Sequence, residues 1–479
     1  MMMLLNLFLP ELVLIFMALV FFFLSFTRPS AGALQLIAII FAGIALFACW
    51  LTYRNSGTLF AGVYQVDGFS QTFKGLIAFG LILIIWMGSG LRGISRAVRP
   101  EYFMFLALSC LGLLLMCSAV ELLTIILSIE LSSYALYILI PMRQHPGRRA
   151  PLEAGIKYIL FGAVATGITL YGMSYLFGLA HSTYLAEIMK VLPNLLVHQP
   201  IAVIGLVMLL CGLFYKLALF PMHFWMPDIY VGAAHETTCF VATLPKIGAA
   251  ALLIRLISLA GGDSVHLVWV LSIMAVLSMT LGNLSALGQD DIKRLLAYSS
   301  IAHAGYIIVG ILSMNELGLV SATYYVYGYM LMNVACFYVI YNLSPEGRNI
   351  CFSDLKGLYK RSPLMAAILT CGSIGLAGIP PMIGFTGKFL IFIAVLQEKY
   401  YWLMGFAVVN VCVSAFYYLR LVRAAYSSIE QETPEIRLDV YTFLLGLLII
   451  VSIIAGGIFP QNFIHLTKIA IGSILYLSR

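Results

Sequence analysis

The chain has 479 residues, of which 62% are hydrophobic and only 10% are Asp, Glu, Lys or Arg. Soluble domains usually carry about 25% charged residues, so this composition excludes that class. The net charge of +7 is spread over many short segments, which argues against a nucleic-acid-binding face. Apolar runs long enough to cross a bilayer recur along the whole chain, and they predict an all-α polytopic membrane protein.

The apolar runs predict about fourteen transmembrane helices, followed by a short amphipathic tail. The predicted spans cover residues 4–25, 33–52, 70–91, 102–118, 121–140, 153–179, 201–226, 237–260, 266–287, 293–313, 318–342, 364–396, 400–424 and 440–459. No low-complexity segment or soluble domain interrupts this series.

Positive charge predicts the orientation of the chain. The loops after odd-numbered spans carry most of the cations: Arg92, Arg96, Arg99, Arg143, Arg148, Arg149, Lys293, Arg294, Arg348, Lys356, Lys360, Arg361, Arg420, Arg423 and Arg437. The loops after even-numbered spans carry little beyond Lys190 and Lys399. Because cationic loops face the cytoplasm, we expect a multi-pass protein of a bacterial inner membrane with both termini on the periplasmic side.

Prolines are expected to break helices at Pro221 in the seventh span, at Pro245 in the eighth, and at Pro380 and Pro381 in the twelfth. The two strongly interrupted spans stand five spans apart and therefore run in opposite directions, which is typical of an inverted repeat with a site near the midplane. We divide the chain accordingly into three N-terminal helices (1–100), a first five-helix repeat (101–262), a second, inverted repeat (263–427), and a C-terminal helix with its tail (428–479).

Four charged residues fall inside predicted spans at similar depth: Glu130, Lys216, Lys246 and Lys388. A charge at the bilayer centre costs about 2.5–3.5 kcal/mol, so charges there usually serve a function. A single pair, such as Glu130 with Lys216, could lock two helices together, but one carboxylate cannot neutralise three lysines. Burial disfavours the charged form of a lysine and a nearby carboxylate favours it, so a lysine between these conditions can gain and lose a proton.

We therefore hypothesise a proton relay in which Glu130 modulates Lys216, and protons pass laterally through Lys246 toward Lys388. Further candidates for the proton route are His303, with Tyr298 and Ser299 one turn earlier, and His223 near the first break. A histidine with hydroxyl neighbours can conduct protons, although a histidine satisfied within the core is an equally good interpretation.

Three other charged residues receive structural interpretations from their positions. Lys293 is expected to be a solvated anchor at the membrane surface. Arg255 and Glu121 lie toward helix ends, where long side chains reach the interface.

The sequence predicts no cofactor in this chain. It contains no phosphate-binding loop, no dinucleotide fingerprint and no pair of histidines at haem-ligand spacing. Its nine cysteines include no C-x-x-C, and most of them fall inside predicted helices, where they are expected to be small buried hydrophobes.

Three segments carry a resemblance to a known family: residues 215–247 (YKLALFPMHFWMPDIYVGA onward), 289–310 (QDDIKRLLAYSSIAHAGYIIVG) and 355–390, with GIPPMIGFTGK inside it. They resemble the antiporter-like subunits of respiratory complex I, and the last segment is similar to the subunit N group in particular. The resemblance implies a fold of fourteen helices with two inverted repeats, and it places the proton-route acid at Glu130 and the lysines at Lys216, Lys246 and Lys388.

The resemblance also implies partners and cofactors. One proton-pumping unit of an NADH:quinone oxidoreductase would contact a neighbouring antiporter-like subunit, small helical subunits, the lateral helix of the largest antiporter-like subunit, and lipid. The flavin, the iron–sulfur clusters and the quinone would belong to partner subunits. The alternatives are a subunit of an Mrp-type cation/proton antiporter, a subunit in the membrane arm of a hydrogenase or of a coenzyme-reducing dehydrogenase from an anaerobe, or a scaffold whose buried charges only lock helices.

Two positions depart from the family pattern. Where relatives usually continue Gly-Ala-Pro, this chain has Gly232-Ala233-Ala234 followed by His235 and Glu236, which adds two titratable groups. Pro245 precedes Lys246 where a small residue is usual. Both departures affect the expected geometry around Lys246.

Overall fold

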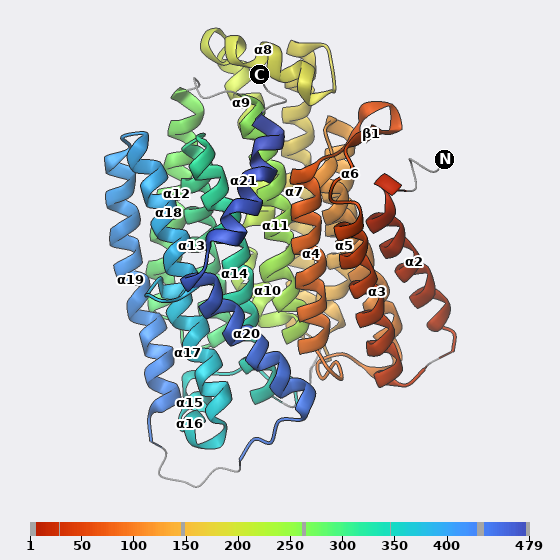
Figure 1. Cartoon of the computed structure of the whole chain (residues 1–479), viewed down its shortest axis with the longest axis vertical. Helices are drawn as coiled ribbons and strands as arrows, with labels where there is room; N and C mark the ends of the chain where they lie inside the picture. The colour runs from red at the N-terminus through yellow and green to blue at the C-terminus, as the bar shows by residue number, and fades with distance from the viewer. Residues whose placement is uncertain are drawn as a thin grey trace.

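The computed structural model describes residues 6–27, 29–144, 149–260, 265–344, 346–428 and 435–475. Its helices stand roughly side by side along one direction (Figure 1). In the described ranges the strands are limited to one small antiparallel hairpin, in which Thr58 pairs with Gln65. The all-α polytopic class predicted from composition is confirmed.

The elements follow in chain order. The N-terminal part contains α2 (Leu9–Leu24), α3 (Ala31–Leu51), β1 (Gly57–Leu59), η1 (Phe60–Gly62), β2 (Tyr64–Val66), α4 (Gly68–Met87) and η2 (Arg96–Val98). Next come α5 (Arg99–Ser118), α6 (Leu122–Leu139), η3 (Ile140–Met142), α7 (Arg149–Ala180), α8 (Leu185–His198), α9 (Pro200–Leu217), α10 (Met226–Gly232) and α11 (His235–Ala260). The remainder contains α12 (Val265–Leu287), α13 (Ile292–Leu312), α14 (Glu316–Leu343), α15 (Phe352–Leu355), α16 (Leu358–Arg361), α17 (Pro363–Ala377), α18 (Ile383–Gln397), α19 (Tyr401–Tyr426), α20 (Val440–Ile458) and α21 (Gln461–Leu475).

Twelve helices of the described part are long and apolar enough to cross a membrane. Three shorter apolar helices, α2, α17 and α18, lie at the positions of the first and twelfth predicted spans. The predicted count of fourteen would treat α2 as one span and the pair α17–α18 as another, and that count stays a prediction. The helix α8 was not predicted; it lies across one end of the bundle (Figure 1).

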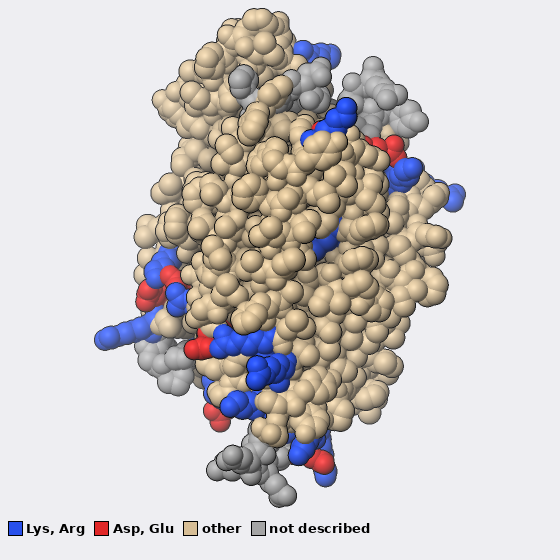
Figure 2. Space-filling model, turned by 90° about the vertical axis from the view of Figure 1, so that its left-hand side faces the viewer, with Lys and Arg blue, Asp and Glu red and all other residues tan. Residues whose placement is uncertain are grey.

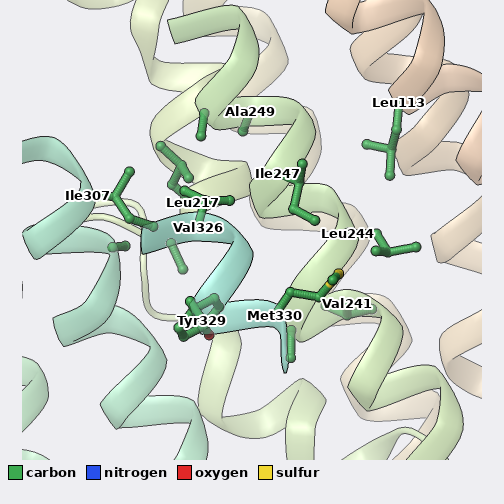
Figure 3. Close-up of a cluster of buried hydrophobic side chains, with 14 of the residues drawn as sticks. Leu113, Leu217, Val241, Leu244, Ile247, Ala249, Ile307, Val326, Tyr329 and Met330 are labelled. Atoms are coloured by element: carbon green, nitrogen blue, oxygen red, sulfur yellow. The ribbon is translucent and has the colours of Figure 1, made fainter. Parts of the chain in front are cut away.

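The centre of the bundle is formed by α11, α13 and α14, which are almost entirely buried, whereas α3, α7, α19 and α20 leave most of their surface open. Side chains from these central helices and their neighbours fill the interior, among them Leu244 and Ile247 of α11, Ile307 of α13 and Met330 of α14 (Figure 3). A side chain on these three helices is therefore shielded from both lipid and water, which makes any charge there expensive.

Charge divides the surface into zones. In Figure 2 most of the Lys and Arg side chains gather toward one end, and a broad belt above them is almost free of charge. The same end carries the loops between α4 and α5, between α12 and α13, and between α14 and α17 (Figure 1). The helix α2 begins and α21 ends at the opposite end, in agreement with an even number of crossings.

The helix break expected at Pro245 does not occur: that prediction was wrong. Pro245 lies inside the continuous helix α11. A proline in a helix interior removes one backbone hydrogen bond and crowds the carbonyl four residues earlier, but neighbouring helices can compensate for this cost in a membrane bundle. Since α11 packs against α4, α5, α9, α13 and α14, its path is held by tertiary contacts on several sides.

Arg255 is not a snorkelling side chain, contrary to expectation. It is 2% exposed, and its guanidinium donates to both carboxylate oxygens of Asp67, at 2.9 and 3.1 Å. Asp67 also caps the N-terminus of α4 by accepting from the backbone N–H of Ser70. This ion pair ties α4 to α11. Glu121, likewise, caps α6 by accepting from the backbone N–H of Thr124 instead of reaching into the interface.

Replacing Asp67 with asparagine is expected to destabilise the protein by about 3–5 kcal/mol, because it leaves a buried guanidinium without its counter-charge. Burial alone would raise the pKa of Asp67, but Arg255 and Ser70 outweigh it and hold that pKa below its ordinary value. The stabilisation is therefore complete above the ordinary Asp pKa of about 3.9 and is lost as the pH falls through the lower folded pKa. Thermal unfolding of the detergent-solubilised protein at neutral and acidic pH measures both effects.

A matched control is Asp290→Asn, which removes a surface ion pair with Arg420 in which Asp290 is 79% exposed. This change is expected to cost less than about 1 kcal/mol. Equal losses in the two variants would contradict the assigned role of the Asp67–Arg255 pair.

Candidate functional site

The first helix break separates α9 from α10. The helix α9 ends at Leu217, and Ala218 adopts a left-handed backbone conformation (φ 56°). The segment up to Trp225 is not helical, and the backbone N–H of Phe220 donates to Ser278 Oγ of α12 at 2.9 Å. The interruption predicted at Pro221 is confirmed. The break leaves backbone groups of α9 in the protein interior, where they face side chains instead of lipid.

The second break separates α17 from α18 and is the one predicted at Pro380 and Pro381. The helix α17 ends at Ala377, and Gly378 follows with φ +86°, a conformation that glycine adopts without strain. Lys388 of α18 folds back onto this end, and its Nζ donates to the carbonyls of Leu376 and Ala377 at 2.8 and 3.1 Å. A cation on the C-terminal carbonyls of a helix is favourable because the helix dipole places negative charge there.

Lys216 lies in the last turn of α9, at the edge of the first break. Its side chain is 1% exposed, and its Nζ has no hydrogen-bond partner. The half-buried Glu130 of α6 accepts instead from Thr166 Oγ1 of α7. Glu130 and Lys216 therefore do not form the ion pair that a simple structural lock would require.

Lys246 lies on α11 at the centre of the bundle and is 0% exposed. Its Nζ donates to the carbonyl oxygen and to Oγ of Ser300 on α13, at 2.7 and 2.6 Å. The ring of Tyr329 on α14 lies 5.3 Å from the same nitrogen, and Tyr230 donates to the Ser300 hydroxyl. These partners are neutral, so the charge of Lys246 is solvated by hydroxyls, a carbonyl and an aromatic face.

His303 lies one turn beyond Ser300 on the same side of α13. Its Nδ1 is 2.5 Å from the hydroxyl of Tyr325, and its Nε2 is 2.9 Å from that of Tyr418 on α19. One turn further, the ring of Tyr306 lies 4.8 Å from Nζ of Lys388. We call Ser300, His303 and Tyr306 the α13 ladder, because residues three apart on a helix lie above one another. The ladder connects the surroundings of Lys246 to those of Lys388.

The other sequence-predicted candidates do not join this ladder. The ring of His223 stacks on Phe224 within the first break, and its Nδ1 has no hydrogen-bond partner. Ser299 donates to the carbonyl of Leu296 in its own helix. Among the hydrogen bonds of the described residues, none involves the hydroxyl of Tyr298, which is half-buried. These three residues stay predictions as members of a proton route.

Several polar residues of the site were missed by sequence reasoning. Thr166, Tyr325, Tyr329 and Tyr418 hold the candidates described above. A signal was available in Tyr325 and Tyr329, since tyrosines four apart in a predicted span share one side of a helix and need polar partners.

Lys293 is not a solvated anchor; that prediction was wrong. It is 0% exposed, and its Nζ donates to the carbonyl of Ala233 at 2.7 Å. The carbonyl belongs to the segment between α10 and α11, which the chain folds over the start of α13. Burial by a segment sixty residues away in sequence cannot be read from the local charge pattern.

Two interrupted helices next to buried lysines define this chain as an antiporter-like membrane subunit. Residues 119–414 match the family described as NADH:quinone oxidoreductase/Mrp antiporter, TM. The NADH-quinone oxidoreductase subunit N 2 of Syntrophobacter fumaroxidans is 41% identical over 98% of this chain and 99% of that protein. The chain therefore belongs to this family, and within it to the subunit N group.

Solved structures agree with the fold. A chain of respiratory complex I from Thermus thermophilus, solved with bound aureothin, has a TM-score of 0.82 and 30% identity, covering 96% of this chain and 99% of that one. A chain of the Mrp complex from Dietzia sp. has a TM-score of 0.87 over 98% of both chains. At 19% identity, the second likeness concerns the fold alone.

Proposed function

We propose that this chain is a proton-translocating membrane subunit of an NADH:quinone oxidoreductase, in which buried Glu and Lys side chains relay protons and electron transfer in other subunits supplies the energy. The observation that carries the proposal is the α13 ladder, which runs from the hydrogen-bond partner of Lys246 to the ring that lies against Lys388. Among the described residues, no carboxylate forms an ion pair with either of these buried lysines. Such lysines are held on neutral partners only, so their protonation responds to small changes in the surroundings.

Glu130 is the carboxylate whose approach or withdrawal would change the proton affinity of Lys216. Moving one charge against about 100 mV of membrane potential takes about 2.3 kcal/mol. A buried lysine that gains or loses a carboxylate partner changes its proton affinity by an energy of this order. Glu130 held by Thr166 corresponds to the unpaired condition of Lys216, and a shift of Glu130 toward Lys216 corresponds to the paired one.

The lateral path then runs from Lys246 along α13 to Lys388. Lys246 donates to the Ser300 hydroxyl, which lies within hydrogen-bond distance of the Tyr329 hydroxyl. His303 lies on α13 between Ser300, which contacts Lys246, and Tyr306, whose ring lies against Lys388. Hydroxyl and imidazole groups can accept one proton and release another, which is the property that such a path requires.

The inverted-repeat division is part of the proposal. It pairs α5–α11 with α12–α19, so that each five-helix unit contains one interrupted helix. In support, α5 packs against α6 as α12 packs against α13, and α7 packs against α9 as α14 packs against α17 and α18.

We assign the redox chemistry to partner subunits that hold the flavin, the iron–sulfur clusters and the quinone. The described residues contain no group of three His, Cys, Asp or Glu side chains placed to bind a metal ion. The proposed partners are a neighbouring antiporter-like subunit, small helical subunits and the lateral helix of the largest antiporter-like subunit, with lipid around the open faces of α3, α7 and α20. The proposed location is a bacterial inner membrane with both termini in the periplasm.

An Mrp-type antiporter subunit is the second candidate function. Eight relatives that are 33% to 43% identical to this chain are named NADH-quinone oxidoreductase subunit N or subunit N 2, which favours the oxidoreductase. Native mass spectrometry of the gently solubilised particle, with an in-gel stain for NADH oxidation, separates the two. Co-purification of flavin and iron–sulfur subunits, together with NADH oxidation, supports the proposal. A particle that contains only membrane subunits and does not oxidise NADH supports the antiporter.

Replacing Glu130 with glutamine is expected to lower NADH-driven proton uptake by about tenfold, because glutamine keeps the shape and the Thr166 contact but removes the charge that modulates Lys216. Proton uptake into inverted membrane vesicles measures this effect. The exposed Glu187→Gln on α8 is the control and should pump normally. Normal pumping by Glu130→Gln would contradict the role of this carboxylate.

A further inference from the structure

A second buried carboxylate lies between the cation-rich end of the molecule and Lys246. Glu236 is in the first turn of α11, ten residues before Lys246 and therefore about 15 Å from it along the helix axis. It is 1% exposed, and the backbone N–H groups of Gly93 and of Glu236 itself lie near its carboxylate oxygens without reaching hydrogen-bond geometry. A buried, unpartnered carboxylate is costly in free energy and needs an explanation.

Two cations flank Glu236 without binding it. Lys293 of α13 donates to the carbonyl of Ala233, and Arg143, which follows η3, donates to the carbonyl of Gly347 and to Oδ1 of Asn349, at 2.7 and 2.9 Å. The hydrogen bonds of Lys293 and of the Arg143 Nη atoms go to backbone and amide oxygens, and neither cation forms an ion pair with the carboxylate. Glu236 is thus held near positive charge and can bind a proton without breaking an ion pair.

Other titratable groups near Glu236 belong to α5, α14 and α11. Arg99 and Tyr102 lie on α5, Tyr341 lies on α14, and Cys239 and the adjacent His235 lie on α11 itself. The Tyr102 hydroxyl accepts from Thr237, and the Tyr341 hydroxyl donates to the carbonyl of Ser89. Asp291 lies near the same two cations, but it is half-buried and caps α13 by accepting from the backbone N–H of Arg294. Among the described neighbours named here, Glu236 is therefore the buried carboxylate.

Loops at the cation-rich end lie over Glu236. A Cβ atom at Gly93 would lie 3.7 Å from Oε1 of Glu236, and Gly347 packs against Gly93 from the other side. The ring of His235 is hydrogen-bonded to the carbonyl of Arg348, whose side chain is 60% exposed. On the inner side, polar groups continue toward Lys246. Asn333 of α14 has an unpartnered Oδ1 and donates to the carbonyl of Tyr329, the residue that faces Lys246.

We propose that Glu236 is the proton-loading carboxylate of this subunit, which takes protons from the aqueous phase at the cation-rich end and delivers them toward Lys246. The proposal rests on the proton-translocating function proposed above. In each cycle the O–H bond of the protonated Glu236 breaks and an N–H bond forms at the neutral amine of Lys246, with the Tyr329 and Ser300 hydroxyls as carriers. The carboxylate is then reprotonated from the aqueous side, so the net change is one proton moved inward.

The alternative is that Glu236 only balances the charges of Lys293 and Arg143, and a pair of variants separates the two roles. Glu236→Gln is expected to lower NADH-driven proton uptake by about tenfold at alkaline pH, where protons are scarce, and by less at acidic pH. A small weak acid such as formate, added to the vesicles, should restore part of the rate. The double variant Glu236→Gln, Lys293→Met should stay slow, because removing both charges does not replace a proton carrier.

The control is Glu153→Gln, a carboxylate at the same end that is 65% exposed, which should pump normally. Recovery of the rate in the double variant, or a deficit in Glu236→Gln that is equal at every pH and insensitive to formate, would overturn the proposal. If the Glu236→Gln complex does not assemble, the pH dependence of proton uptake is measured in Glu236→Asp, which keeps a carboxyl group on a shorter side chain. An altered pH profile is expected, and an unaltered profile would overturn the inference.

The Lys246→Ala variant in the same vesicles tests the underlying function. If this variant pumps normally, the proposed function itself has failed.

Discussion

Replacing Lys246 with alanine is expected to lower NADH-driven proton uptake by about tenfold or more, the largest functional loss for a single side chain of this subunit. Lys246 is fully buried, and its ammonium group is the donor to both oxygens of Ser300. Alanine removes the amine that accepts the proton on the proposed route and that is hydrogen-bonded to Ser300 of the α13 ladder. Proton uptake and NADH oxidation in inverted vesicles should be measured together, because a blocked relay slows both.

A surface lysine provides the control for this experiment. Lys356 is exposed in the loop that precedes α16, and Lys356→Ala should leave both rates within about twofold of the unmodified protein. A Lys246→Ala complex that assembles and pumps at the normal rate would remove Lys246 from the proton route.

Replacing Gly384 with valine is expected to destabilise the protein by about 3 kcal/mol or more, because the added side chain would overpack the junction of the two half-helices. A Cβ atom at Gly384 would lie 1.9 Å from the carbonyl oxygen of Gly375, which belongs to the other half of the interrupted helix, and 2.8 Å from Sδ of Met332. The backbone oxygen cannot move without shifting α17, whose last carbonyls hold Lys388. The substitution therefore disturbs stability and the site together.

The matched control is Gly405→Val on α19, where a Cβ atom would meet nothing within 4 Å. Its thermal unfolding temperature in detergent should stay close to that of the unmodified protein, while Gly384→Val should unfold well below it or fail to accumulate in the membrane. Similar stability of the two variants would show that the two half-helices do not depend on their close approach.

The two helix breaks and the buried lysines were predictable because their signals are local. Proline and glycine act on the backbone of their own turn, so Pro221 and the Gly378–Pro381 segment ended helices as expected. Lysines in apolar runs are conspicuous for the same reason, since a span of about 20 residues fixes their depth. The class of the fold and the position of Lys216, Lys246 and Lys388 follow from such signals.

The partners of these lysines were not predictable, because they depend on which helices meet. Ser299 and Ser300 are equivalent in sequence, yet only Ser300 faces Lys246. Pro245 was expected to break a helix, but packing around α11 carries the helix through it. Lys293 has the sequence surroundings of a surface residue and becomes buried only because the segment before α11 folds over it. Each of these outcomes is set by tertiary contacts.

The number of protons delivered per NADH oxidised tests most directly whether protons pass through this subunit. The complete complex, reconstituted into liposomes with either the unmodified chain or Lys246→Ala, can be given a limited amount of NADH while the internal pH is followed. We expect the residual turnover of the Lys246→Ala complex to deliver fewer protons per NADH than the unmodified complex. An undiminished proton yield at an undiminished rate of NADH oxidation would contradict the account.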